Sequence, residues 1–241
     1  EDKSIFLKDL IEKIKNEKEN LVYKFLKQNN INILIFIDLI EGLIKDQNNV
    51  KIQNKKELIT YSYKVAGTVG LMMSKIIGVT NKKANSSAID LGIAMQLTNI
   101  ARDVFEDAQM HRVYLPADWI PAITIPMLSE EQKLETHQEL IISSAIIKLI
   151  DLSEKFYSNG FDGLKFIPYK TRLGIFIAAN VYRGIGIKIR KKGRRYLKTR
   201  IYLNTFEKLI VTIKSISIFI FIPFINYKYQ KIRNSINNEN L

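Results

Sequence analysis

Apolar residues recur every three or four positions along most of the chain, with lysine, glutamate and asparagine between them. This spacing places apolar side chains on one face of an α-helix, and no stretch alternates apolar and polar residues as a half-buried strand does. The predicted helices span residues 3–27, 32–45, 56–77, 83–107, 129–159, 169–195 and 205–225. Prolines at 116, 121 and 126 break the region after the fourth helix. We predict one all-α domain over residues 1–225 and a basic, frayed tail over 226–241.

The last predicted helix ends in an apolar run, residues 216–225, that contains one serine and one proline. The run is only about ten residues long, whereas a helix needs roughly 20 to cross a bilayer. Lys214 lies inside any longer window. We interpret the run as a buried or interfacial segment.

The fourth predicted helix carries an unusual group of oxygen-bearing side chains. Residues four apart share a helix face, so Asp103 and Asp107 are expected side by side, with Asn99 and then Gln96 above them. Two carboxylates beside apolar surface are costly unless a cation lies between them. Mg²⁺ shared with a phosphate-bearing ligand fits this donor set. The alternative is a solvated acidic face that includes Glu106.

Two glycines, Gly67 and Gly70, lie inside the third predicted helix. Each costs about 1 kcal/mol relative to alanine. The cost indicates close helix packing or a ligand that lies near the backbone.

Composition narrows the functional classes. Hydrophobic residues make up 46% of the chain, so a real core is expected. Cysteine is absent, which excludes disulfides, thiolate metal sites and a cysteine nucleophile. Only His111 and His137 occur, which excludes a histidine-rich metal site. No secretory signal opens the chain, and we expect a cytoplasmic location.

The formal net charge is +13. Such a balance suits a polyanionic small substrate, an anionic membrane or nucleic acid, but codon bias toward lysine also explains much of it. The basic run at 188–195 lacks the interleaved aromatic residues and the fold motifs of a nucleic-acid reader. We therefore expect no nucleic-acid partner.

Several segments resemble signature regions of the phytoene/squalene synthase family. Its second aspartate-rich region is similar to residues 96–107, QLTNIARDVFED, and 112–116, RVYLP. Its other signature helix, in the version of bacterial phytoene synthases, is similar to residues 61–73, YSYKVAGTVGLMM. Further similarity occurs at 38–46, 181–189 and, more weakly, 200–209, so the resemblance covers about residues 30–210. It implies a single-domain isoprenoid-synthase helical bundle around a central cavity.

The resemblance also implies an activity. A phytoene synthase condenses two geranylgeranyl diphosphates head to head, through a cyclopropyl diphosphate, in the first step of carotenoid biosynthesis. The implied cofactor is Mg²⁺, with Mn²⁺ as an alternative, and no redox cofactor is expected. The implied partner is a prenyl diphosphate, and no obligate protein partner is inferred. The basic run and the lipid substrates suit peripheral contact with an anionic membrane.

Site residues are carried over by position. The resemblance assigns catalysis to Asp103, Asp107 and Tyr61, and metal binding to Asp103, Asp107 and Asn99. Substrate and diphosphate binding is assigned to Gln96, Asn99, Arg102, Arg112, Tyr114, Val65, Tyr182 and Arg200. Simpler alternatives are an ion pair of Arg102 with Glu106, a plain core role for Tyr61, and a surface turn for Arg112 and Tyr114.

One expected motif does not occur. Relatives carry a first Asp-x-x-x-Asp motif on the opposite wall of the cavity, and Asp9 with Glu12 and Lys13 on an ordinary amphipathic face does not match it. We expect the chain to lack the N-terminal helices of this fold, to expose apolar surface there and to be inactive or impaired as given, although its parent is a phytoene synthase. Alternatives are a squalene or dehydrosqualene synthase acting on farnesyl diphosphate, and a non-catalytic, membrane-associated assembly factor of the same family.

Overall fold

The computed structural model describes residues 3–18, 20–129, 134–193 and 200–221. The helices are α1 (Lys3–Asn16), α2 (Leu21–Gln28), α3 (Ile33–Lys45), α4 (Lys55–Ser62), the π-helix η1 (Tyr63–Gly67), α5 (Thr68–Ile76), α6 (Ala84–Arg102), α7 (Val104–Gln109), the 3₁₀ helix η2 (Ala117–Trp119), α8 (Ile125–Leu128), α9 (Thr136–Asp162), the 3₁₀ helix η3 (Leu164–Phe166), α10 (Tyr169–Lys192) and α11 (Thr205–Ile220). The predicted all-α class is confirmed. Two-residue strands β1 (Val50–Lys51) and β2 (Arg112–Val113) pair in parallel, and they are too short for a sequence pattern to reveal.

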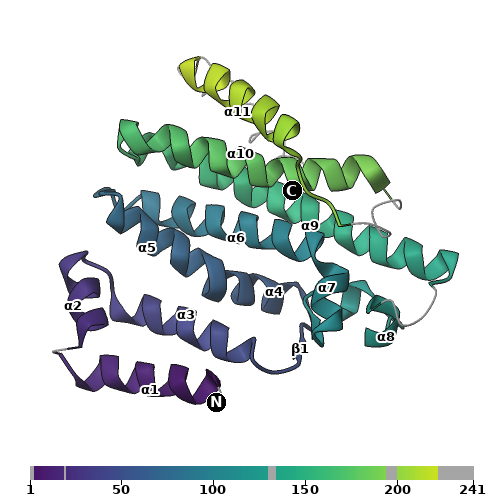
Figure 1. Ribbon diagram of the computed structural model, residues 1–241, viewed down its shortest axis with the longest axis horizontal. Helices are drawn as coiled ribbons and strands as arrows, with labels where there is room; N and C mark the ends of the chain where they lie inside the picture. The colour runs from purple at the N-terminus through teal and green to yellow at the C-terminus, as the bar shows by residue number, and fades with distance from the viewer. Residues whose placement is uncertain (1–2, 19, 130–133, 194–199, 222–241) are drawn as a thin grey trace, which may run out of the picture.

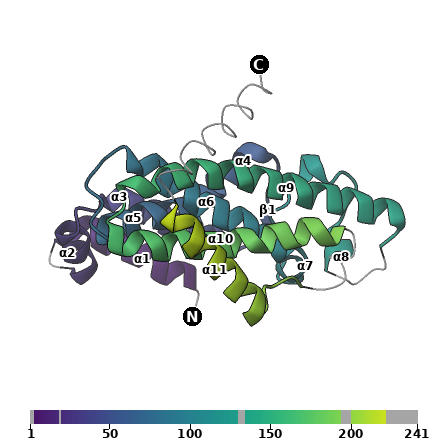
Figure 2. The ribbon, with the colours of Figure 1, turned by 90° about the horizontal axis from the view of Figure 1, so that it is seen from above.

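The helices stack in layers around α6 (Figure 1). Helix α6 packs against α5 and η1 on one side and against α9 and α10 on the other, while α1 lies on α3 and α11 lies on α10. Figure 2 shows from above that α9 and α10 run along most of the molecule. The main core is centred on this α6–α9 contact, where Leu97, Ala101, Ile146 and Leu149 are almost completely buried.

Three predicted helices differ from the observed ones. The segment 3–27 forms two helices, because the Asn20 side chain accepts a hydrogen bond from the Val22 amide and starts α2 there. The segment 83–107 breaks at Asp103, which has φ −108° and ψ 18°. Helix α9 begins at Thr136 rather than 129, because a capping box at Glu135 fixes its start. The predicted tail, 226–241, lies outside the described residues.

Helices α5 and α6 approach each other closely where both lack side chains. A Cβ atom on Gly70 would lie 2.2 Å from the Ala88 carbonyl oxygen, and one on Gly92 would lie 2.3 Å from the Ala66 carbonyl oxygen. Neither distance is sterically possible, so only glycine permits this packing. The close packing expected at Gly70 is therefore confirmed.

None of the helices that the structure describes combines the length and the apolar content needed to cross a bilayer. Helix α11 packs its Phe219 ring near the rings of Phe176 and Tyr169. The part of the apolar run that is described thus belongs to a surface helix with one packed face.

Candidate functional site

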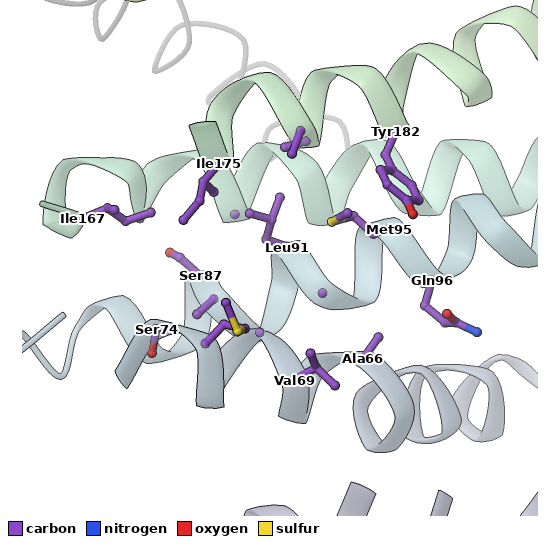
Figure 3. Close-up of a pocket in the computed structure, with 18 of the residues that line it drawn as sticks. Ala66, Val69, Ser74, Ser87, Leu91, Met95, Gln96, Ile167, Ile175 and Tyr182 are labelled. Carbon is purple, nitrogen blue, oxygen red and sulfur yellow. The ribbon is translucent and has the colours of Figure 1, made fainter. Parts of the chain in front are cut away.

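A cavity of about 390 Å³ lies between η1, α5, α6 and α10, with the end of α9 closing one side (Figure 3). Small and apolar side chains form most of its wall, including Val65, Ala66, Val69, Gly70, Met73, Leu91, Gly92, Met95, Ile167 and Ile175. Gln96 and Tyr182 lie toward one end in Figure 3, and Asn99, one turn after Met95 on α6, lines the same cavity. The cavity is therefore apolar along its length and carries amides at one end.

The predicted acidic pair follows Asn99 at the junction of α6 and α7. Although the helix breaks at Asp103, the Asp107 amide still donates to the Asp103 carbonyl at 2.8 Å, so one helical turn separates the two residues. Their carboxylates are close enough for Asp103 to raise the pKa of Asp107. The expected side-by-side arrangement survives the break.

Two arginines hold Asp103. The Arg102 Nε donates to the Asp103 carboxylate at 2.8 Å, and an Arg200 nitrogen lies 3.0 Å from it. Arg200 also reaches Glu106, with its Nε 3.2 Å from the carboxylate. The alternative ion pair of Arg102 with Glu106 is not what forms, because Arg102 turns to its chain neighbour. The structure thus places Arg200 beside the acidic pair.

A half-buried carboxylate, Asp46, organises the opposite edge of this cluster. Tyr61 and Tyr114 each donate a hydroxyl hydrogen bond of 2.9 Å to it, one to each oxygen. Their rings stack with centroids 4.7 Å apart. Burial raises the pKa of Asp46, and the hydrogen bonds from Tyr114 and Tyr61 partly offset this. Tyr61 thus points its hydroxyl to Asp46 and does not line the apolar cavity.

Asp46 was missed as a functional residue. It lies in the family-like segment 38–46, and it is the C-cap of α3. A carboxylate at a helix C-terminus opposes the helix dipole. That local conflict was the available signal, but its tyrosine partners come from distant segments that no local pattern connects.

Asp107 has the most strongly perturbed carboxylate of the cluster. Its pKa rises from 3.8 to about 7, first because of burial and then because of Asp103, Glu106 and Asp46, while Arg112 lowers it. Among the described residues, no hydrogen bond or ion pair holds this carboxylate. Arg112 thus contributes by its charge near both Asp107 and Asp46.

These residues fit a divalent cation. The Asn99 Oδ1 atom is buried and has no hydrogen-bond partner, which is costly unless a ligand fills the position. It lies on the same helix as Asp103, one turn before it. The described part of the chain contains no cluster of three or more acidic, histidine or cysteine side chains placed to hold a metal alone. Mg²⁺ commonly binds through one or two carboxylates and takes its other ligands from water and phosphate.

The predicted residues therefore form two adjoining groups. Val65, Gln96, Asn99 and Tyr182 line the cavity. The polar cluster contains Tyr61, Arg102, Asp103, Asp107, Arg112, Tyr114 and Arg200, and the structure adds Asp46 and Glu106 to it. Together they make an apolar cavity that adjoins a cluster of carboxylates, arginines and tyrosines.

Comparison with known proteins gives concordant matches. The squalene/phytoene synthase family model matches residues 11–207. The 15-cis-phytoene synthase of Paracoccus sp. is 36% identical over 177 residues, covering 72% of this chain and 55% of that protein. The phytoene synthase of Thermus thermophilus is 36% identical over 181 residues, covering 75% of this chain and 61% of that protein. The chain thus spans somewhat more than half the length of these relatives.

Solved structures show the same architecture. A dehydrosqualene synthase in complex with ligand superposes with a TM-score of 0.71 at 25% identity, covering 88% of this chain and 77% of that one. A squalene synthase from Alicyclobacillus acidocaldarius superposes with a TM-score of 0.66 at 16% identity, covering 77% and 72%, and it supports the fold alone. The predicted isoprenoid-synthase bundle is confirmed.

Proposed function

The chain belongs to the squalene/phytoene synthase family, and from this premise we propose that it serves the head-to-head condensation of two geranylgeranyl diphosphates to phytoene, through a cyclopropyl diphosphate. The observation that supports this most directly is the junction of an apolar cavity with a polar head. The cavity suits a prenyl chain, and Asn99 connects it to Asp103 and Asp107. The reaction starts carotenoid biosynthesis and requires no redox cofactor.

We assign the diphosphate to the polar head. Asn99, Asp103 and Asp107 would hold Mg²⁺ or Mn²⁺, which neutralises the charge of a departing diphosphate when bound. Arg112 and Gln96 face the same region as donors to phosphate oxygens. Arg102 and Arg200 fix the Asp103 carboxylate and limit its rotation.

The cavity has a separate task. Ionisation of an allylic diphosphate leaves a carbocation, which water would quench. We assign this task to the side chains of Val65, Met95 and Tyr182, which present largely apolar surface to the prenyl chain of the substrate and exclude water from it. Tyr61 and Tyr114 donate their hydroxyl hydrogen bonds to Asp46 and not to Asp103 or Asp107. We therefore assign the two tyrosines to holding Asp46 in place.

The substrate length is the finer part of the proposal. The similarity to relatives named phytoene synthases supports geranylgeranyl diphosphate, a C20 substrate, for this protein. The structural likeness to a dehydrosqualene synthase makes condensation of farnesyl diphosphate the alternative. A non-catalytic assembly role is disfavoured, because Asp103, Asp107 and an unpaired Asn99 oxygen remain together.

The test is product analysis with Mg²⁺ and either geranylgeranyl or farnesyl diphosphate, on a form of the protein that carries the first Asp-x-x-x-Asp motif, because the chain as given is expected to be inactive or impaired. We expect phytoene from the C20 substrate and little C30 product, and a loss of at least about a hundredfold in Asp103→Asn and Asp107→Asn. The matched control is Asp118→Asn, at an exposed aspartate on η2. Dominant C30 product would establish the alternative substrate, and normal turnover of both site variants would contradict the metal assignment.

The proposal includes peripheral contact with an anionic membrane, because both substrate and product are lipids.

A further inference from the structure

Helix α11 exposes an apolar face that the fold does not use. Its packed face contains Ser215 and Phe219, which are buried against the rest of the molecule. The opposite face carries what we call the α11 outer stripe: Phe206, Leu209, Ile210, Ile213, Ile216 and Ile220. Exposed fractions reach 69% at Phe206, 54% at Ile213 and 67% at Ile220.

The stripe is one continuous band. Its residues recur at intervals of three and four, so at 100° per residue they lie within one side of the helix. The 16-residue helix makes the band about 24 Å long. Figure 1 shows α11 at the outer edge of the molecule, beyond α10 and opposite α1. A continuous apolar band on an outer helix marks an interaction surface, whereas single exposed apolar residues do not.

Positive charge lies along one flank of the stripe. Lys214 is exposed on α11, next to Ile210 around the helix, and Lys192, exposed at the end of α10, lies close enough to influence Glu207 on the same flank. The acidic residue of α11, Glu207, is neutralised by Lys188 at 2.6 Å.

We propose that the α11 outer stripe is the surface by which the protein docks on an anionic lipid membrane. The helix lies flat, its apolar side chains enter the interface, and the flanking lysines contact lipid headgroups. This arrangement needs no membrane-spanning helix. The α11 outer stripe would thus be the surface that makes the membrane contact included in the proposed function. The observations that support it come from α11 and its flank and do not depend on the catalytic assignment.

Charge favours a membrane over a second copy of the chain. An antiparallel twofold contact would place each stripe on its equivalent and bring the positive flanks of both copies, which carry Lys192 and Lys214, toward each other. Like charges beside an apolar interface weaken such a pairing. An anionic bilayer instead attracts the same lysines while it buries the same side chains.

The test is flotation of the purified protein with phosphatidylcholine vesicles, with and without phosphatidylserine, in the absence of any prenyl diphosphate. We expect binding to the anionic vesicles, and a loss of about tenfold or more in a Phe206→Ser/Ile213→Ser double variant. The matched control is Leu21→Ser/Leu34→Ser, at exposed leucines on α2 and α3, which should change binding less than twofold. A second variant, Lys214→Glu, should reduce the preference for anionic vesicles.

The outcomes separate the hypotheses. Circular dichroism confirms that each variant is folded, which we expect because every changed side chain is exposed. Equal binding of wild type and both α11 variants would overturn the proposal. So would a wild-type dimer that the serine variant converts to monomer, without vesicle binding. Because the assay contains no substrate, vesicle binding is measured independently of catalysis, and a protein that docks but makes no product leaves this surface standing.

Discussion

Replacing Asp107 by asparagine should stabilise the protein at neutral and alkaline pH. The Asp107 carboxyl is half-buried beside Asp103 and Glu106, and its pKa rises from 3.8 to about 7. The folded protein therefore holds a proton on Asp107 where the unfolded chain has released it. Stability consequently falls as pH rises from about 4 to about 7, because ionisation is more costly in the folded state.

The magnitude follows from that pKa difference. Each pKa unit corresponds to about 1.4 kcal/mol, so the full difference would amount to about 4 kcal/mol. Asp107 is not fully buried, and water screens part of the repulsion, so we expect about half of this, ~2 kcal/mol. Asparagine has a similar shape and cannot ionise. The variant should therefore gain ~2 kcal/mol of unfolding free energy at pH 8 and almost nothing at pH 4.

Urea unfolding followed by circular dichroism between pH 4 and pH 8 measures this difference. Subtracting the wild-type curve from the Asp107→Asn curve cancels a perturbed carboxyl group that does not interact with Asp107, such as Asp90, whereas Asp46 and Glu106 are coupled to Asp107 and contribute to the difference. The control is Asp118→Asn, at an exposed aspartate outside the cluster. Added Mg²⁺ and inorganic diphosphate should stabilise the wild type but not Asp107→Asn. A variant that is less stable than wild type at pH 8 would refute the reasoning.

Two further predictions concern the scaffold around the site. Gly70→Ala should lower the unfolding free energy by about 3 kcal/mol, because its Cβ would collide with the Ala88 carbonyl. Gly174→Ala on α10, where a Cβ meets nothing within 4 Å, should raise the unfolding free energy by about 0.5–1 kcal/mol in the same urea-unfolding assay. Equal effects of the two substitutions would contradict the close approach of the helices at Gly70. Tyr61→Phe and Tyr114→Phe should each lower the unfolding free energy by about 1.5 kcal/mol at pH 7 and by less at pH 4, because each loses a hydrogen bond to ionised Asp46. A double-mutant cycle should show a coupling energy of at least about 0.5 kcal/mol between the two substitutions. Strict additivity at every pH would show that the two hydroxyls do not share this acceptor.

Local sequence patterns predicted the parts of the site that lie on one helix. Gln96, Asn99 and Asp103 follow helical spacing, and Asp107 keeps its place across the break because the backbone hydrogen bond to residue 103 persists. The break itself was not predictable from propensity, since no proline or glycine marks it. It coincides with the ion pairs that Asp103 makes with Arg102 and Arg200, which are tertiary features.

The parts that were missed depend on contacts between distant segments. Asp46 meets Tyr61 and Tyr114 only after α3, α4 and the β2 segment have assembled. The parallel pairing of Val50 with Arg112 fixes how those segments meet. A single sequence carries no periodicity that links such positions, so the identity of the acidic partner for these tyrosines required the fold.

The electrostatics of the assembled cluster explain why a diphosphate needs a cation there. Helix α3 ends at Asp46 and α6 ends at Asp103, so two helix C-termini, which carry partial negative charge, converge on a region that already contains the carboxylates of Glu106 and Asp107. Arg102 pairs with Asp103, and Arg200 pairs with both Asp103 and Glu106, so neither arginine can offer its full charge to a ligand. A polyanion that entered this region alone would be repelled, whereas a divalent cation would relieve the repulsion between the carboxylates and attract the polyanion at once. In the proposed function, Asp107 with its raised pKa and the unpaired Asn99 oxygen would both serve as ligands of the cation that the diphosphate requires.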